Sequence, residues 1–258
     1  GQGQDQGQAP RPAQTPDGRP NFNGVWQANN EAHWDLLGRS MSRIMELARE
    51  LRLWVVLGCN HRLSGRHKPH NSLYVIDDRG SIVNRFDKLF LATTDGKKGD
   101  VQHYSHGEAF VAFEVQHVKC GLLICHDFRY PELFREYKRR GVQLMLVSFH
   151  NAGMQRVEYD MYMKTVSATL QAAAASNFFT VSATNGTRRY AWPSFVVNAE
   201  GCVISSDQPH RPTVLINTID TNEKLYDAPV CWRVRCLRGV YHSGPLVKDK
   251  RSRDRTCH

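Results

Sequence analysis

The chain has 258 residues, of which 41% are hydrophobic and 23% are charged, a composition typical of a globular protein with a sizeable core. Its longest apolar runs, such as "LWVVLGC" and "CGLLIC", are far shorter than the roughly 18 to 20 residues that a membrane-spanning helix needs. The formal net charge is +9, but part of this excess lies in the C-terminal run "VKDKRSRDR", and no basic motif with interleaved aromatic residues is present. We therefore expect neither a membrane span nor a nucleic-acid partner.

The N-terminal 20 residues are rich in Gln, Gly and Pro, which predicts a disordered leader. This leader has no apolar segment of a signal peptide and no amphipathic pattern of a transit peptide, although a signal that has already been removed stays open. Seven cysteines, an odd number at irregular spacing, favour reduced thiols over a disulfide framework in a chain of this length. These features together predict a cytoplasmic protein.

The first regular elements follow an atypical segment, residues 21–39, whose aromatic residues show no clear period. "SMSRIMELARELRL" places apolar residues at helical spacing and predicts an amphipathic helix over residues 40–53. "WVVLGC" predicts a buried strand, and "NSLYVIDDRGSIVNRFD" predicts a hairpin that turns at its Asp-Asp-Arg-Gly sequence.

The remaining sequence alternates strand and helix patterns. "EAFVAFEVQHVKCGLLIC" predicts an outer strand that leads into a central one, and "YPELFREYKRRG" predicts a helix with Pro131 in its first turn and Gly141 beyond its end. "VQLMLVSF" and "FFTVSAT" predict buried strands on either side of a long helix over residues 159–177. "PSFVVNAEGCVISS" predicts a second hairpin, "TVLINTID" a last strand, and residues 236–258 a basic tail. This alternation predicts an α/β protein with mixed sheets covered by helices.

Cys125 ends an apolar run and precedes a turn into a helix. Backbone N–H groups and the positive end of the helix dipole can stabilise a thiolate at such a place. The N–H of His126 would also point near an oxyanion formed on a carbonyl group attacked by the thiol. The alternative is a buried structural thiol, because cysteine is among the most buried residue types. The side chain of His126 is a poor base for its neighbour, since adjacent residues on a strand face opposite ways.

Neither a metal nor another cofactor is predicted. Cys120 and Cys125 are five residues apart, and so are Cys231 and Cys236, which is not the spacing of a zinc knuckle. Lys88, in "IVNRFDKLFL", is either a surface side chain with a buried stem or a buried cation near Cys125. In the second case its charge would lower the pKa of the thiol and stabilise an oxyanion.

Four segments resemble, in order and spacing, the nitrilase or carbon-nitrogen hydrolase superfamily. They are "NSLYVIDDRGSIVNRFDKLFL", "HYSHGEAFVAFEVQHVKCGLLICHDFRYPELFR", "VSATNG" and "SFVVNAEGCVI", and the second contains the family's Cys-x-Asp-x-Arg-[Phe/Tyr]-Pro-Glu signature. The resemblance implies an α-β-β-α sandwich over residues 40–235, without metal or organic cofactor. It also implies homodimers or larger assemblies in an α-β-β-α-α-β-β-α arrangement.

The resemblance also implies roles for single residues. Cys125 matches the nucleophile, which attacks an amide, carbamoyl or nitrile carbon and forms a thioester or thioimidate that water hydrolyses. Lys88 matches the lysine that supports the tetrahedral intermediate. Asp100 falls near a second family glutamate, which orients the lysine or the water; the alternative is a solvated loop aspartate.

Four further residues are candidates for supporting the site. Arg129 and Glu132 are expected to form an ion pair that fixes the turn after Cys125, or else a surface charge pair of little energetic weight. His150 and Asn151 follow the strand at residues 142–149, where substrate-contacting residues collect on loops. They would line a polar pocket for a small-molecule substrate.

The N-terminal part departs from the family pattern. Family members carry the general-base glutamate in a Phe-Pro-Glu segment after their second strand, but residues 1–39 contain no such segment and no strand-like run. Glu31 matches no motif, so the first β-α-β unit is predicted to be missing. The sequence therefore supports two hypotheses: a hydrolase of amide or N-carbamoyl bonds, or a catalytically impaired nitrilase-like binding or assembly protein.

Overall fold

The structure, a computed structural model, describes residues 25–28, 39–61, 66–93, 95–150, 156–185, 193–207, 213–220, 222–254 and 256. The chain divides into two units, Gly1–Leu225 and Tyr226–His258. Both predicted β-sheets and all helices that cover them lie in the first unit.

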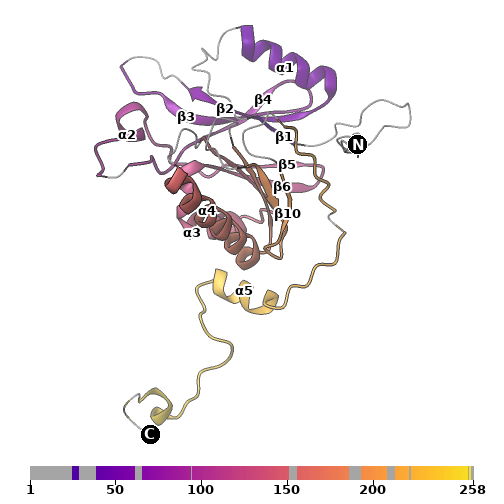
Figure 1. Ribbon diagram of the computed structural model, residues 1–258. Helices are drawn as coiled ribbons and strands as arrows, with labels where there is room; N and C mark the ends of the chain where they lie inside the picture. The colour runs from indigo at the N-terminus through magenta and orange to yellow at the C-terminus, as the bar shows by residue number, and fades with distance from the viewer. Residues whose placement is uncertain are drawn as a thin grey trace, which may run out of the picture. The chain divides into compact units, whose positions relative to one another are not determined.

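The first sheet has four strands in the order β1-β2-β3-β4 (Figure 1). Strand β1 runs parallel to β2, whereas the β2–β3 and β3–β4 pairs are antiparallel. One face of this sheet packs against helix α1, whose buried Met41 and Ala48 contact Leu57 and Tyr74. The elements are β1 (Val25–Ala28), α1 (Arg39–Leu51), β2 (Trp54–His61), β3 (His70–Ile76) and β4 (Ile82–Asp87).

The second sheet has six strands in the order β10-β9-β8-β7-β6-β5. Its centre is parallel, because β6, β7 and β8 follow one another through helical connections, and its two edges are antiparallel hairpins. The strands are β5 (Ala112–Val115), β6 (Val118–Ile124), β7 (Leu144–Ser148), β8 (Thr180–Thr184), β9 (Phe195–Val197) and β10 (Val203–Ser206).

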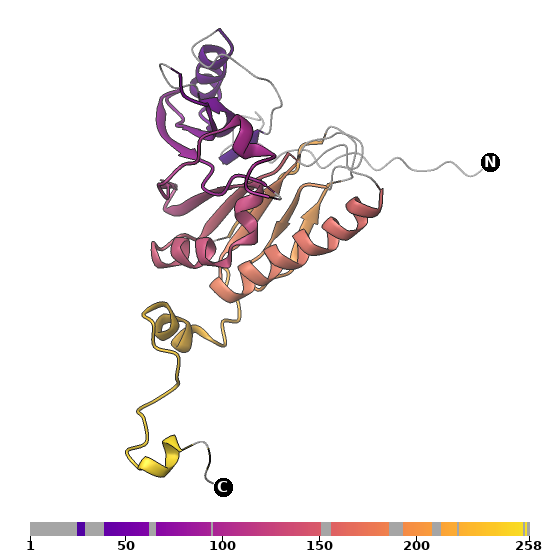
Figure 2. The same ribbon diagram turned by 90° about the vertical axis from the view of Figure 1, so that its left-hand side faces the viewer.

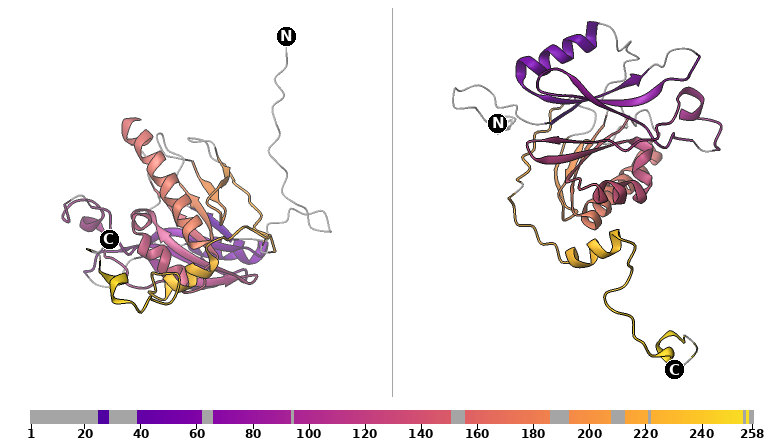
Figure 3. Two further views of the ribbon diagram at one scale, coloured as in Figure 1. Left: turned by 90° about the horizontal axis from the view of Figure 1, so that it is seen from below. Right: turned by 180° about the vertical axis from the view of Figure 1, so that it is seen from behind.

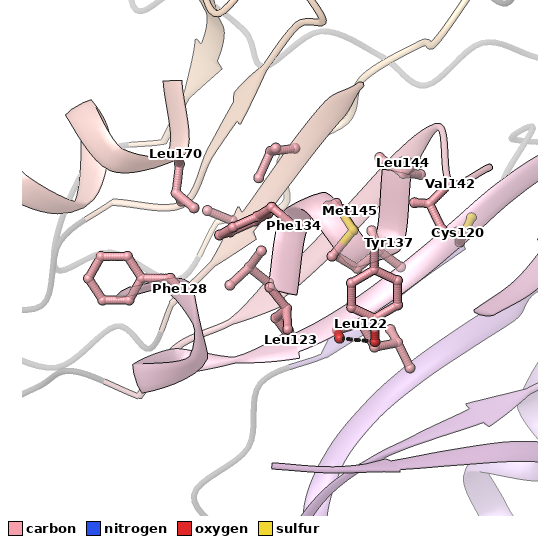
Figure 4. Packing of buried hydrophobic residues seen from close by; sticks show 14 of the residues in the cluster. Cys120, Leu122, Leu123, Phe128, Phe134, Tyr137, Val142, Leu144, Met145 and Leu170 are labelled. Carbon is pink, nitrogen blue, oxygen red and sulfur yellow. Dashed lines mark hydrogen bonds between the residues drawn. The ribbon is translucent and has the colours of Figure 1, made fainter. Parts of the chain in front are cut away.

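Helices α3 (Pro131–Arg139) and α4 (Arg156–Asn177) cover the outer face of the second sheet (Figure 2). The inner faces of the two sheets meet in one apolar core, in which the Trp54 and Phe113 rings stack with their centroids 6.0 Å apart. Tyr137 of α3 reaches under β6 and donates its hydroxyl to the carbonyl of Leu122 at 2.6 Å (Figure 4). The layers are therefore α-β-β-α, as the family resemblance implies, and the view from behind shows the same order (Figure 3).

The predicted helices and both predicted hairpins are confirmed, and Gly141 and Gly201 adopt the positive φ values of 80° and 89° that their turns require. One prediction about the N-terminal segment is wrong. Residues 25–28 form a strand in an interval expected to hold none, and Val25 lies opposite Trp54 in a parallel ladder. A run of four residues is too short for periodicity to reveal, so only its pairing with β2 identifies it.

The prediction of a last strand over residues 213–220 is also wrong. A strand needs a neighbour that accepts and donates its backbone hydrogen bonds, and none of the described strands pairs with this segment. Its alternating apolar residues stay in solvent, with Val214 66% and Ile216 52% exposed. A side-chain hydrogen bond from Ser205 to Asn217 is what joins it to β10.

The second unit contains the predicted basic tail. It holds helix α5 (Val230–Leu237), in which Arg233 is buried and pairs with Asp227, and a short 3-10 helix, η2 (Lys250–Arg253). In both units, no described helix combines the length and the apolar character that crossing a membrane would require.

Candidate active site

Cys125 lies at a strained turn at the carboxyl end of β6. The strand before it is fully buried from Cys120 to Ile124, and a 3-10 helix, η1 (Cys125–Arg129), starts at the cysteine and leads into α3. Cys125 has a φ of 44°, a left-handed conformation that is unfavourable for a residue with a Cβ atom. Strain of this kind is found where a strand-to-helix turn presents a nucleophile, and the Cys125 side chain is partly exposed.

The carboxyl ends of the parallel strands bring His150, a predicted pocket residue, to the sheet edge at which Cys125 lies. Ile124 of β6 lies opposite Ser148 of β7, so His150, two residues further on and exposed, follows the neighbouring strand end. Ligands of parallel sheets bind at this edge. Asn151, its predicted companion, lies outside the described residues.

Lys88 comes directly after β4 of the other sheet and is a buried cation. Its side chain is 2% exposed, and Nζ donates to Oδ2 of Asp100 at 2.5 Å. Its backbone is fixed on both sides, since its N–H donates to Asn71 and its carbonyl accepts from Gly107. A buried cation needs a partner of opposite charge, and the carboxylate of Asp100 is that partner.

Asp100 begins the short helix α2 (Asp100–His103) and turns its carboxylate toward Lys88. The same oxygen, Oδ2, also accepts from the backbone N–H of Ala92 at 3.1 Å. Its side chain is 26% exposed, so it is more sheltered than a solvated loop aspartate. The structure thus places the predicted carboxylate beside the predicted lysine.

Asp127 joins the lysine segment to the cysteine turn. Its Oδ1 accepts from the N–H of Phe90 at 2.8 Å, and its Oδ2 accepts from the N–H of Ile124 at 3.1 Å. Phe90 is two residues beyond Lys88, and Ile124 directly precedes Cys125. Burial raises the pKa of Asp127 to about 6, against the opposing effects of these backbone hydrogen bonds and of the Lys88 charge.

His126 lies within the electrostatic influence of the same lysine. Burial lowers the pKa of its imidazole, and the charges of Lys88 and Arg129 lower it further, so the neutral ring is favoured. Nε2 lies 3.2 Å from the hydroxyl of Tyr130. The ring is therefore engaged with Tyr130, and the predicted role of the His126 backbone N–H at an oxyanion stays a prediction.

Arg129 and Glu132 do not form the ion pair that the sequence led us to expect. The Arg129 guanidinium lies 5.1 Å from the centroid of the Phe128 ring, whereas Glu132 is exposed in the first turn of α3. Among the ion pairs between described residues, none joins these two side chains. Glu132 instead lies where the helix dipole favours a negative charge.

Two aromatic residues near the turn were not singled out from the sequence. The rings of Phe90 and Tyr130 lie with their centroids 4.1 Å apart, and Phe90 is 42% exposed. The sequence around Tyr130 does not indicate this contact, because Phe90 follows a strand of the other sheet.

In the part of the chain that the structure describes, no cluster of three or more His, Cys, Asp or Glu side chains could hold a metal ion.

An α-β-β-α sandwich with a cysteine turn at a strand end and an ion pair between Lys88 and Asp100 defines a nitrilase-fold protein, and comparison with solved structures agrees. The carbon-nitrogen hydrolase of Helicobacter pylori G27 superposes with a TM-score of 0.59 at 19% identity, covering 67% of this chain and 64% of that one. The NitFhit protein of C. elegans gives a TM-score of 0.59 at 24% identity and covers 67% and 44%.

The sequence identifies the family within this fold. The profile of the Carbon-nitrogen hydrolase family matches residues 20–224, and the chain belongs to that family. Nitrilase homolog 2 of Dictyostelium discoideum is 24% identical over 195 residues, 72% of this chain and 58% of that protein. The omega-amidase NIT2 of Mus musculus is 30% identical over 113 residues, 42% of this chain and 41% of that protein. This chain thus matches little more than half the length of the first relative and less of the second.

Proposed function

We propose that the protein hydrolyses the carbon-nitrogen bond of a small amide or N-carbamoyl compound through a thioester on Cys125. The observation that carries this proposal is the ion pair of the buried Lys88 with Asp100, together with Asp127, which joins the segment after Lys88 to the backbone beside Cys125. A fixed cation whose segment is hydrogen-bonded to the turn of a strained, partly exposed thiol suits acyl chemistry, because charge develops on the carbonyl oxygen in the transition state.

In the first half of the reaction the Cys125 Sγ attacks the carbonyl carbon, and a C–S bond forms. The carbonyl electron pair moves onto oxygen, and the ammonium of Lys88 stabilises the resulting oxyanion. The tetrahedral intermediate collapses with cleavage of the C–N bond, and the amine leaves with the proton of the thiol. In the second half water attacks the thioester carbon, releases the acid and restores the thiol.

The environment of the turn supports a polar substrate of modest size. His150 follows β7 at the same sheet edge as Cys125, and the Phe90–Tyr130 pair adds an aromatic surface nearby. Several of the relatives are amidases by name, among them a deaminated glutathione amidase and an omega-amidase. We extend only the reaction class, hydrolysis of an amide-type bond, to this chain.

The cysteines support a reducing compartment. Six cysteines lie in the described part of the chain, and no disulfide joins any of these six to another. Burial raises the pKa of the Cys59 and Cys120 thiols to about 12, which leaves both unreactive. A reducing, cytoplasmic location would keep a nucleophilic Cys125 active.

The test measures ammonia release from a panel of small amides and N-carbamoyl amino acids. Cys125→Ala should abolish turnover, while Cys202→Ala, which removes an exposed thiol of the β9–β10 turn, should retain it. Peptide mapping after brief iodoacetamide treatment should find Cys125 labelled faster than Cys202 and Cys231. If no substrate is turned over and Cys125 labels no faster than these exposed thiols, the enzyme proposal fails. The impaired binding or assembly protein then becomes the better description.

A further inference from the structure

Asp127 is a buried carboxylate that the proposed reaction does not use. It is fully buried, yet it makes no ion pair among the described residues and uses its oxygens for backbone amides on both sides. One amide, from Phe90, belongs to the segment after β4 of the first sheet. The other, from Ile124, belongs to the end of β6 in the second sheet.

This arrangement supplies a polar link between two sheets that otherwise meet through apolar packing. No ladder joins β4 to β6, because each belongs to a separate sheet. Apolar contacts such as that of Trp54 with Phe113 are not directional, whereas hydrogen bonds to a charged acceptor fix both distance and orientation. The link lies two residues from Lys88 and one residue from Cys125.

We propose that Asp127 is a positioning residue, which sets the place of the Lys88 ammonium relative to the Cys125 thiol by clamping the Phe90 and Ile124 amides. This inference rests on the proposed function, because the clamp matters only if the lysine and the thiol act together. A displacement of about 1 Å between reacting groups can lower a rate by about 10²-fold.

The clamp should respond to pH. Burial raises the pKa of Asp127 to about 6, and a protonated carboxyl turns one of its two acceptor oxygens into a donor that faces an N–H group. The charged or titratable groups around it are Lys88 after β4, Tyr137 from α3 and, in its own turn, Cys125, His126 and Arg129. The titration of His126, whose pKa burial lowers, has to be separated from that of Asp127.

The test compares two buried aspartates. Asp127→Asn keeps the shape but presents an NH₂ group to one of the amides, and so imitates the protonated clamp at every pH. Asp77→Asn is the matched control, since Asp77 is 1% exposed and accepts from the N–H groups of Arg79 and Ser81 at the opposite end of the β3–β4 hairpin.

We expect Asp127→Asn to lower kcat by about 10²-fold with little change in KM, and to remove an inflection near pH 6 from the kcat profile. Asp77→Asn should keep both the wild-type kcat and the inflection. Equal kcat values and equal profiles for the two variants would overturn the proposal.

Labelling of Cys125 separates failure of this inference from failure of the proposed function. Absence of turnover by wild type counts against the proposed function alone, because the rate of iodoacetamide labelling at Cys125 still reports the clamp. That rate should fall several-fold in Asp127→Asn and not in Asp77→Asn. If circular dichroism shows that Asp127→Asn does not fold, a His126→Asn variant replaces it in the test. The rate of Cys125 labelling in this variant is then measured as a function of pH. An inflection that persists near pH 6 supports the clamp, and a profile without it overturns the clamp.

Discussion

At the scale of single residues, the ion pair of Lys88 and Asp100 makes the sharpest prediction. Lys88→Met keeps most of the side-chain volume but removes the cation, and Asp100 loses its partner at 2.5 Å. We expect kcat to fall by about 10² to 10³-fold, the cost of losing one group that stabilises an oxyanion.

Lys119→Met is the matched control for this change. Lys119 lies on β6, the strand that ends directly before Cys125, but at the opposite end of that strand. Steady-state kinetics of the two variants should therefore differ by about 10²-fold or more. A Lys88→Met protein with the kcat of Lys119→Met would show that the buried cation takes no part in the reaction.

Asp127 makes a second prediction at this scale, on stability. Burial raises the pKa of Asp127 from the usual aspartate value of 3.8 to about 6 in the fold, so the native state binds the proton more tightly than the unfolded chain. Protonation therefore favours folding, and the contribution of Asp127 to the free energy of unfolding falls as pH rises between these values. The loss is about 3 kcal/mol, because each unit of pKa shift corresponds to about 1.4 kcal/mol.

Urea unfolding of wild type and Asp127→Asn at several pH values measures this contribution. Asp77 and other carboxyls with a lowered pKa give the opposite slope, so the quantity to follow is the difference between the two proteins. Relative to the variant, wild type should lose stability from about pH 4 to about pH 6 and then level off. A difference that stays constant over this range would contradict the burial effect on Asp127.

At the scale of elements, strand β6 depends on the close approach of helix α3. A Cβ atom at Gly121 would lie 2.7 Å from Cδ1 of Tyr137 and 2.9 Å from Sδ of Met145. Tyr137 cannot move freely, because it is fully buried and donates to Leu122. Gly121→Ala should therefore destabilise the fold by about 1 to 3 kcal/mol through overpacking.

Thermal or urea unfolding checks this cost. Gly244→Ala is the control, since a Cβ atom there would meet no atom within 4 Å, and we expect it to be close to neutral. If Gly121→Ala matched Gly244→Ala in stability, the packing of α3 against β6 would be looser than the structure shows.

The elements near the cysteine could be predicted because their signals are local. The apolar run before Cys125, Pro131 at the start of α3 and Gly141 after its end all lie within one continuous stretch. Burial of both faces makes such a strand uniformly apolar, and the helix boundaries follow from backbone sterics. Local rules therefore account for the strand, the turn and the helix.

The contacts between sheets could not be predicted in the same way. Asp127 accepts from Phe90, 37 positions earlier in the chain, and nothing in the spacing of the two residues marks this contact. The fate of residues 213–220 is also non-local, since alternating apolar residues become a strand only where another strand can pair with them. The family resemblance predicts roles for Lys88, Asp100 and Cys125, but the link between the segments of Lys88 and Cys125 appears only in three dimensions.

At the scale of the whole molecule, the outer surface of α4 carries a stripe of apolar residues. Val157 is 81% and Met161 is 57% exposed, and they lie four residues apart on one helix. Ala168, Ala172 and Ala175, which are exposed, continue this stripe, and the exposed Lys164 interrupts it between Met161 and Ala168. A helix with apolar residues on both faces is suited to packing on both sides, and the second side is available to a second copy of the chain.

We therefore predict a homodimer in which α4 packs against α4 of its partner, in the α-β-β-α-α-β-β-α order that the family resemblance implies. Because an isologous interface uses the same patch twice, one substitution places two equal charges close to the symmetry axis. Met161→Glu should then raise the dissociation constant of the dimer by tenfold or more, since about 1.4 kcal/mol of repulsion and desolvation suffices for that factor.

Leu51→Glu, at an exposed position of α1 in the opposite layer, is the control and should leave the dimer intact. Sedimentation velocity distinguishes the 29.4 kDa chain from its dimer, and a wild-type protein that sediments as a monomer at micromolar concentration would rule this interface out.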